Sequence, residues 1–347
     1  MSTALGIALL GAVACTQDHD FLGKDPPTTS SASGGGGGAG GEAGTGAGGA
    51  GGSEPEEPPG PPKLTVVNGV NDYGAIRICF VPHPGSSGAG VAPWPASAAG
   101  LGFARAEVID PIGAVIPAGE AVQLHVVAGD LGATAGVDCE EILALAEEAG
   151  APIVAAALPV LPAEVFVAER SLLVAPVGCM GGPGHSDPAQ AAICGASYTE
   201  ATPTVSLAAA VMSRIAAPGK VRLQVLHASA AMPPVDVRIV TGFDAATEHQ
   251  VAPELSPGAI GPFPPFASLA RADLGPVTGV KLRTYPPGQT TTTSEVTLGE
   301  ALAQGGLEEA DIADGEGLVA VAVGAAPGTA SGPFWHALTY ALVKSDP

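Results

Sequence analysis

Cys15 stands where its thiol could carry a lipid. The uncharged apolar run from Ala4 onward ends in Ala12-Val13-Ala14-Cys15. Small residues directly before a cysteine resemble the bacterial lipobox, in which the thiol is acylated. Ala12 replaces the usual leucine, and Ala-x-Ala is also an ordinary signal-peptidase site. We therefore predict a signal peptide over residues 1–14 and lipid attachment at Cys15, with plain secretion as the alternative.

Four further cysteines could form disulfides. An even number of cysteines in an exported chain favours disulfides, and four cysteines allow three pairings. Cys79 and Cys139 lie in a part of the chain that recurs later without cysteines, which makes them a matched pair. Cys179 and Cys194 both lie in an extra segment, about 176–204, that the later copy lacks. The sequence therefore favours the pairs Cys79–Cys139 and Cys179–Cys194.

The extra segment also holds residue types that bind metals. Cys179, His185, Asp187 and Cys194 lie within sixteen residues of chain. Zinc sites usually contain a close Cys-x-x-Cys or His-x-x-x-His pair, and this segment has neither. A disulfide-closed loop is thus preferred over a metal site, and we predict no metal and no cofactor.

Other patterns suggest catalysis only at first sight. Gly184-His185-Ser186-Asp187-Pro188 begins like the nucleophile elbow of a hydrolase, but Pro188 stands where that motif has glycine, and no clear strand precedes it. Asp311, Asp314 and Glu316 lack the alternate spacing of a calcium loop. A set of glutamates is expected on the wet face of a helix: Glu140, Glu141, Glu147 and Glu148. We predict no catalytic residues and no enzyme.

The composition is strongly acidic and excludes some partners. Asp and Glu total 34 against 13 Lys and Arg, for a formal net charge of −21. Such a charge repels phosphate backbones, so we predict no nucleic-acid binding, and it disfavours docking on anionic lipid. No uninterrupted apolar stretch reaches eighteen residues, so no transmembrane helix is expected. Membrane attachment is therefore predicted through the N-terminal lipid alone.

Residues 15–62 have the composition of a tether. Glycine and alanine dominate from Gly34 to Gly52, and a proline-rich stretch follows from Glu54 to Pro62. Glycine-rich chains are flexible and proline-rich chains are stiffer and extended, so about 48 residues would span on the order of 40 Å. A disordered tether directly after a lipidated cysteine would lift a folded domain clear of a membrane.

An internal repeat divides the rest of the chain. Residues 63–81 align without a gap to residues 222–240, at an offset of 159, and each copy reads as strand, turn, strand. In the second copy Arg222, Gln224, Asp236 and Arg238 alternate with apolar residues, which is typical of half-buried strands. Later segments also correspond: 104–108 with 270–274, and 122–126 with 280–284. We place two domains at 63–217 and 218–347.

Each domain should contain several short strands and one short helix. Asp138 with Glu141, and Thr297 with Glu300, have the spacing of helix-capping pairs. This pattern favours a mainly β fold rather than alternating βαβ units. We predict two tandem β-sandwich domains, Ig-like or Greek-key, each with one short helix.

The second copy resembles a known family. Residues 221–229 read Val-Arg-Leu-Gln-Val-Leu-His-Ala-Ser, and residues 233–237 read Pro-Pro-Val-Asp-Val. This is similar to the opening signature of domain of unknown function 4397, over roughly twenty residues. The first copy departs from it, with Asn68 in place of His227 and Arg77 in place of Asp236. The resemblance implies a secreted or lipid-anchored bacterial or archaeal β-domain, often in tandem. It implies no activity and no functional residues.

These observations favour an exported protein of the bacterial cell envelope. We predict a non-catalytic lipoprotein that displays two β-sandwich domains as a structural or protein-interaction module. Its ligand would be an unknown envelope, matrix or protein component. A module that binds a glycan or another small ligand is the alternative.

Overall fold

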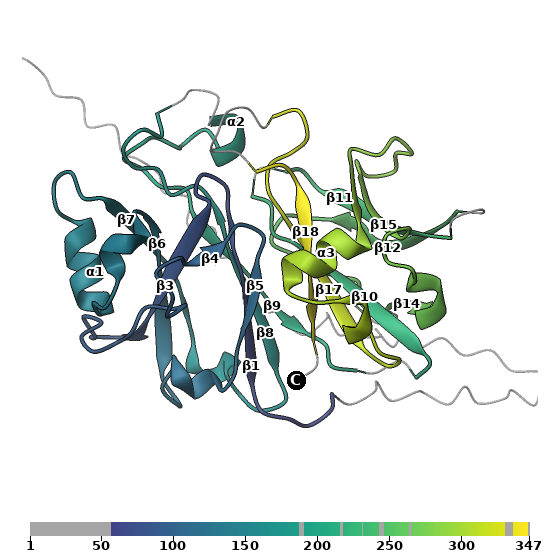
Figure 1. Ribbon diagram of the computed structural model, residues 1–347, viewed down its shortest axis with the longest axis horizontal. Helices are drawn as coiled ribbons and strands as arrows, with labels where there is room; N and C mark the ends of the chain where they lie inside the picture. Colours follow the sequence, from purple (N-terminus) through teal and green to yellow (C-terminus); the bar gives the residue numbers. More distant parts are fainter. Residues whose placement is uncertain are drawn as a thin grey trace, which may run out of the picture. The chain divides into compact units, whose positions relative to one another are not determined.

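Four β-sheets, two in each half of the repeat, make up most of the structure (Figure 1). The computed structural model describes residues 57–186, 191–215, 218–230, 232–242, 246–263, 266–329 and 336–345. The predicted signal peptide, Cys15 and most of the predicted tether lie outside these residues. We call residues 63–215 the first half and residues 220–345 the second half.

Each half contains an inner and an outer sheet. The first inner sheet consists of β1 (Lys63–Val67), β2 (Gly69–Val70), β5 (Ala106–Ile109), β8 (Ser171–Gly178) and β9 (Ser206–Met212). The first outer sheet, in spatial order, consists of β4 (Leu101–Gly102), β3 (Ala75–His83), β6 (Ala121–Gly129) and β7 (Ile153–Leu161). In the inner sheet β1 pairs with β8 in parallel and with β5 in antiparallel.

The second half repeats this arrangement. Its inner sheet consists of β10 (Lys220–His227), β13 (Ile260–Gly261), β14 (Ala267–Ala270), β17 (Gly317–Val323) and β18 (Thr339–Lys344). Its outer sheet, in spatial order, consists of β12 (Thr247–Leu255), β11 (Val235–Thr241), β15 (Lys281–Tyr285) and β16 (Ser294–Thr297). β10 pairs with β17 in parallel, as β1 does with β8. The predicted fold class, two tandem β-sandwiches, is confirmed.

Short helices connect the strands. α1 (Cys139–Ala146) begins at Asp138, whose carboxylate accepts a hydrogen bond from the Glu141 amide. α3 (Leu298–Gly305) begins with the predicted Thr297–Glu300 capping box. α1 lies between β6 and β7, whereas α3 follows β16, so the two helices occupy different places in the two sandwiches. The extra segment adds α2 (Ala191–Cys194), and single turns of 3-10 helix complete the set: η1 (Ile112–Ala114), η2 (Leu131–Thr134), η3 (Ala163–Val165), η5 (Arg271–Leu274) and η6 (Glu309–Asp311).

Strand register tests the aligned segments of the repeat. Ile78 pairs with Val126, and Val237 pairs with Thr284 at the matching place, as the alignment of 122–126 with 280–284 requires. The alignment of 104–108 with 270–274 is wrong. The first segment leads into β5, whereas residues 271–274 form η5.

The two inner sheets share one hydrophobic core. It joins Val67, Leu173, Ala175, Val177, Ala208, Ala210 and Met212 of the first half to Leu226, Val319, Val321, Val323, Ala341 and Val343 of the second. The opposite face of the second inner sheet packs on its own outer sheet, in a core around Leu223, Val225, Val237 and Ile239. The opposite face of the first inner sheet is also buried, at Leu64, Val66, Leu172 and Val174. The inner sheets are therefore buried on both faces.

This packing overturns one expectation from the alternating pattern. Arg222, Gln224 and Asp236 are 1–3% exposed, so β10 and the start of β11 are not half-buried. The polar face of β10 is turned toward the first half rather than toward water: the Gln224 side chain accepts from the Ser213 amide, and Arg222 donates to the Ser213 carbonyl. Arg222 and Gln224 are therefore buried because the first half covers this face of β10, whereas Asp236 is buried beneath the backbone of Glu254 and Gly288.

The last residues of the predicted tether are held against the start of β8. The Arg214 side chain, 1% exposed, donates to the carbonyls of Pro61 (2.7 Å) and Arg170 (2.8 Å) and to the Ser171 hydroxyl (2.8 Å). The Ser171 hydroxyl donates in turn to the carbonyl of Ser345 (2.5 Å). We call Pro61, Ser171, Arg214 and Ser345 the foot. It joins the tether to both halves.

No helix among the described residues has the length and apolar character needed to cross a membrane.

Candidate functional site

His227 closes the connection between β10 and β11. Its Nδ1 accepts from the Ser229 amide (3.3 Å), and its Nε2 lies 3.1 Å from the Pro233 carbonyl. Since Nδ1 accepts a hydrogen bond, Nε2 carries the ring proton and donates a hydrogen bond to the Pro233 carbonyl. The Ser229 hydroxyl donates to the Gly324 carbonyl (2.5 Å). The residues that carry the family resemblance therefore have structural roles here.

In the first copy a different side chain makes the same bond to the amide two residues on, and its second bond goes to another segment. The Asn68 Oδ1 accepts from the Val70 amide (3.0 Å), and its Nδ2 donates to the Leu101 carbonyl (2.9 Å). Both side chains are fully buried. An asparagine amide and a neutral imidazole each offer one acceptor and at least one donor, so either residue satisfies this turn.

This equivalence predicts the effect of His227→Asn. Burial lowers the pKa of His227, so the folded state binds this proton less readily than the unfolded state. Its contribution to stability is full above the unfolded pKa, about 6.5, and is lost as pH falls below that value. We expect His227→Asn to fold and to lose less stability between pH 7.5 and 5 than the wild type does.

Thermal or urea unfolding at several pH values checks this expectation. Each such histidine contributes a slope of at most about 1.4 kcal/mol per pH unit. Some slope should remain, because burial also lowers the pKa of His125 and His336. An unchanged pH profile in His227→Asn would show that this histidine does not set the acid sensitivity.

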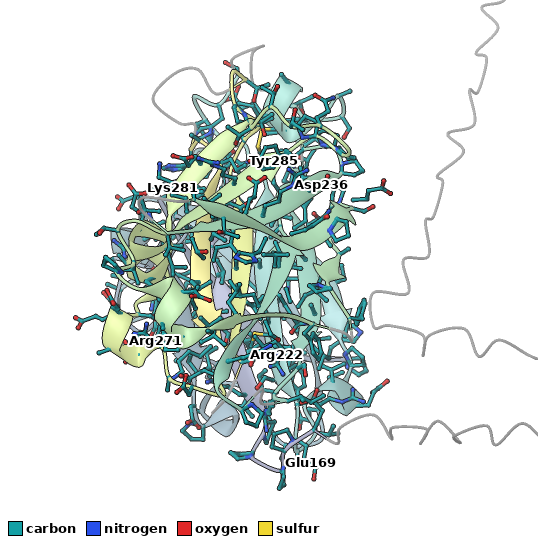
Figure 2. The ribbon with its side chains drawn as sticks, turned by 90° about the vertical axis from the view of Figure 1, so that its right-hand side faces the viewer. Glu169, Arg222, Asp236, Arg271, Lys281 and Tyr285 are labelled. Carbon is teal, nitrogen blue, oxygen red and sulfur yellow. A yellow bond between two sulfur atoms is a disulfide. The ribbon has the colours of Figure 1, made fainter. Side chains whose placement is uncertain are left out.

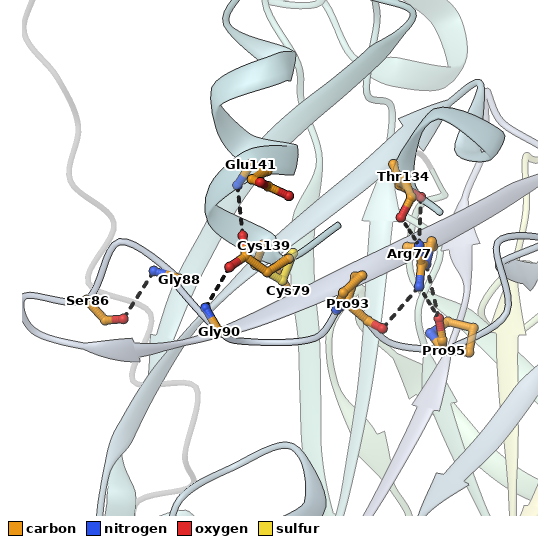
Figure 3. Close-up of a disulfide and its surroundings, with 11 residues drawn as sticks. Arg77, Cys79, Ser86, Gly88, Gly90, Pro93, Pro95, Thr134, Cys139 and Glu141 are labelled. Atoms are coloured by element: carbon orange, nitrogen blue, oxygen red, sulfur yellow. Dashed lines mark hydrogen bonds between the residues drawn. A yellow bond between two sulfur atoms is a disulfide. The ribbon is translucent and has the colours of Figure 1, made fainter. Parts of the chain in front are cut away.

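The first predicted disulfide, Cys79–Cys139, is confirmed. It ties the start of α1 to β3, and the Asp138 carboxylate, which caps α1, also accepts from the Gly90 amide (2.7 Å) (Figure 3). Cys79, Val127, Ile142 and Ile153 form a small core under the helix. The disulfide thus holds α1 and the loop after β3 over the outer face of the first outer sheet.

Arg77 and Asp236 occupy the same place in the two copies with opposite charge. The Arg77 guanidinium donates to the carbonyls of Pro93, Pro95 and Thr134, at 2.8–3.2 Å (Figure 3). The Asp236 carboxylate instead accepts backbone amides of Glu254 (2.8 Å) and Gly288 (3.0 Å). Each charge is matched by the backbone groups that surround it, carbonyls around Arg77 and amides around Asp236.

The corresponding outer face of the second half is covered by ion pairs rather than by a helix. Arg238 contacts Glu248 (3.1 Å), and Glu295 contacts Lys281 (2.5 Å) and Arg283 (2.6 Å). The Arg238 guanidinium also lies over the Tyr285 ring, at 4.3 Å from its centroid. Asp236 and Tyr285, which pair across β11 and β15, lie beside each other in Figure 2, and Lys281 lies at the other end of β15. Opposite charges on neighbouring strands stabilise a solvent-facing sheet.

The second predicted disulfide, Cys179–Cys194, is also confirmed. It closes the segment between β8 and β9, residues 179–205, and packs with Ile193, Tyr198 and Ala325. Ala325 belongs to the second half, so the closed segment touches both sandwiches.

Asp72 and Tyr73, in the turn between β2 and β3, hold this segment in place. The buried Asp72 carboxylate accepts from the amides of Met180 (2.9 Å) and Gly181 (2.8 Å) and lies 3.4 Å from His185 Nδ1. The Tyr73 hydroxyl donates to the Gly181 carbonyl (2.6 Å), and its ring stacks on His185, with centroids 4.5 Å apart.

Two further rings adjoin Tyr73. His336 of the second half hydrogen-bonds to the Tyr73 backbone and stacks on Phe103 of the first half, with centroids 3.9 Å apart. The Phe103 amide donates to the Gly74 carbonyl (2.9 Å). We call Asp72, Tyr73, Phe103, His185, Tyr198 and His336 the head. It is the candidate site, because it gathers aromatic and ionisable side chains from both halves.

The hydroxyl and carboxylate groups of the head form hydrogen bonds with backbone groups. Burial, with the Asp72 charge adding to it, raises the pKa of Tyr73 and Tyr198 above its usual range, so both phenols stay protonated. Tyr198 donates to the His185 carbonyl (3.0 Å). These bonds stabilise the loops and present rings, an arrangement suited to binding rather than to proton transfer.

No family model matches the chain, and no curated protein matches it.

The other sequence candidates lie apart from a common centre. Cys15, Asp187 and Pro188 lie outside the described residues. The Ser186 side chain is exposed beside the buried His185. Asp311 completes a capping box with Glu308, and Glu316 pairs with Lys344, so this acidic turn is structural. The helix glutamates Glu140, Glu141, Glu147 and Glu148 are exposed, as expected.

The described residues give little support to a metal site or a ligand pocket. No three His, Cys, Asp or Glu side chains there are grouped as a metal ion would require. A cavity of about 230 Å³ lies at the side of the second sandwich, lined among others by Ile239, His249, Ser268 and Leu269. It is small for a ligand pocket.

Sequence reasoning missed the head. Its residues are spread from Asp72 to His336, and no local motif links them. The chain has only four tyrosines, and two of them, Tyr73 and Tyr198, lie here. The scarcity of aromatic residues marks each tyrosine as worth attention, but it does not indicate which aromatic rings contact one another.

Proposed function

We propose that the chain is an exported cell-envelope lipoprotein, anchored through Cys15, whose two β-sandwiches serve as a non-catalytic structural or protein-interaction module. The resemblance of residues 221–240 to domain of unknown function 4397 belongs to the same proposal. The ligand would be an envelope, matrix or protein component.

One observation gives the main support for presentation of the head away from the membrane. The end of the tether and the head lie at opposite ends of the strands. β8 begins with Ser171 at the foot and ends with Gly178, which pairs with Val70 just before the head. At about 3.3 Å per residue the two ends are roughly 23 Å apart. Figure 1 shows α2 at one end of the strands and the start of β1 toward the other. A tether fixed at the foot would direct the head away from the membrane.

Disulfides add weight to an exported location. Both bridges join buried cysteines, and stable structural disulfides are typical of proteins outside the cytosol.

The anchor is tested by fractionating cells that produce wild type, Cys15→Ala or the adjacent control Thr16→Ala. We expect Cys15→Ala to move from the membrane to the soluble fraction and to lose incorporation of labelled fatty acid. The control should stay with the membrane. Membrane association of Cys15→Ala equal to wild type would overturn the lipid anchor.

A glycan-binding module is the second candidate. The partly exposed rings of Tyr73, Phe103 and His336 favour it, because aromatic rings offer flat apolar surfaces with polar edges. Specific capture of oligosaccharides by the purified chain would support it over a protein partner.

A further inference from the structure

Three rings of the head are partly exposed and lie in segments that hydrogen-bond to one another. Tyr73, Phe103 and His336 are each partly exposed. They are joined through the Tyr73–Gly74 backbone, which hydrogen-bonds to both His336 and Phe103. Tyr73 stacks on His185 and Phe103 stacks on His336, so the rings are held in fixed orientations. A pre-ordered aromatic surface loses little conformational entropy on binding.

The charge around these rings has one sign. In the sequence, the stretches that contain the six residues of the head, 69–74, 101–104, 179–205 and 324–338, have no lysine or arginine. The adjoining Arg105 is occupied elsewhere, because it donates to the Ala303 carbonyl of α3. Acidic groups are present: the Glu200 side chain accepts from the Gly184 amide (3.0 Å), and Asp72 lies beneath. Burial lowers the pKa of His336, so this ring is neutral at pH 7.

We propose that the head binds a cationic segment of a protein partner, a short stretch bearing lysine or arginine. This inference rests on the proposed function and names the chemistry of its ligand. The ring faces attract cations through their quadrupole, and Glu200 supplies a counter-charge. The net charge of −21 would speed the approach of a basic partner. A neutral glycan gains nothing from this charge, so the cationic segment is the better fit.

Binding to defined peptides tests the proposal. The full-length Cys15→Ala protein is titrated with an octapeptide of alternating Lys and Gly, an Arg and Gly peptide, a Gln and Gly peptide, and a neutral chitin oligosaccharide. Calorimetry or fluorescence anisotropy is measured in 20 mM and 300 mM salt. We expect the basic peptides to bind at least ten-fold more tightly than the Gln peptide and to weaken in high salt.

Variants locate the binding surface. Phe103→Leu, which removes the ring and keeps an apolar side chain, should weaken basic peptides by about three- to ten-fold. Glu200→Gln keeps the acceptor for Gly184 while removing the charge, and should have a similar effect. Phe263→Leu is the matched control, because Phe263 is 69% exposed in the loop after β13, outside the head. It should bind as the unsubstituted protein does.

Three results would overturn the proposal: equal affinity for the Gln peptide, equal weakening by Phe263→Leu, or binding of the oligosaccharide alone with loss in Phe103→Leu. Should Phe103→Leu fail to fold, Glu200→Gln decides the outcome alone. Membrane fractionation of Cys15→Ala measures lipid anchoring, and the titrations measure peptide binding. Failure of this proposal is therefore distinguishable from failure of the proposed function.

Discussion

Replacing Leu173 by alanine is expected to destabilise the second half of the chain as well as the first. Leu173 is fully buried in the core that the two inner sheets share, against residues of β17 and β18. Removing a buried leucine side chain costs about 2–5 kcal/mol of the free energy of unfolding. Since each inner sheet loses an entire covered face when its partner leaves, we expect the halves to unfold together.

Hydrogen exchange during urea unfolding checks this expectation in both halves at once. The amides of β6, in the first half, and of β15, in the second, should lose protection at the same urea concentration. Leu173→Ala should lower that concentration equally for both strands. Val108→Ala is the control, because Val108 is 45% exposed and its loss should change little. Unchanged protection of β15 in Leu173→Ala would show that the halves unfold independently.

The second large effect is expected from the disulfide over the first outer sheet. Cys79 and Cys139 close a loop of 60 residues. In the chain-entropy model such a bridge stabilises the folded state by about 4 kcal/mol. Cys79→Ala with Cys139→Ala should lower the free energy of unfolding by roughly that amount and expose the small core under α1, around Ile142 and Ile153.

The second bridge supplies the comparison. Cys179 and Cys194 close a loop of 15 residues, for which the same model predicts about 3 kcal/mol. Urea unfolding of the two double variants should therefore rank the Cys79–Cys139 variant as the less stable. Protection of α1 should fall in that variant alone. The opposite rank would mean that packing of the closed segments, rather than loop length, sets the contribution of each bridge.

The shared core also gives the repeat a physical meaning. Val67 and Leu226 are equivalent positions of β1 and β10, and both face the other half. The same holds for Leu173 with Val319 and for Val177 with Val323, which follow Ser171 and Gly317 at matching distances. Each half thus offers the same face to the other, as the subunits of a symmetric dimer do. The link between the halves makes this association permanent.

The sequences of β8 and β17 already indicate strands that are buried on both faces, although the alternating pattern of β10 indicates a strand with a solvent-facing side. β8 and β17 read Ser-Leu-Leu-Val-Ala-Pro-Val-Gly and Gly-Leu-Val-Ala-Val-Ala-Val. Continuous apolar runs without alternation indicate strands that are buried on both faces. The neighbouring strand β10 does alternate, and its Arg222 and Gln224 suggested a solvent-facing side. These groups can be buried because they bond to the Ser213 backbone of the other half and to Ser345 and Pro262 of their own half.

Much of this protein follows from the sequence alone. The period of two and the capping pairs predicted the fold class and the starts of α1 and α3, and the repeat matched the segments that form β6 and β15, because these features depend on short stretches of chain. The cysteine pairing also followed, since the repeat showed which cysteines had no counterpart. Tertiary structure alone decided which polar residues are buried and which rings meet in the head. Those outcomes depend on side chains from Asp72 to His336 that only the packing of the two halves brings together, and no local pattern records contacts across that distance.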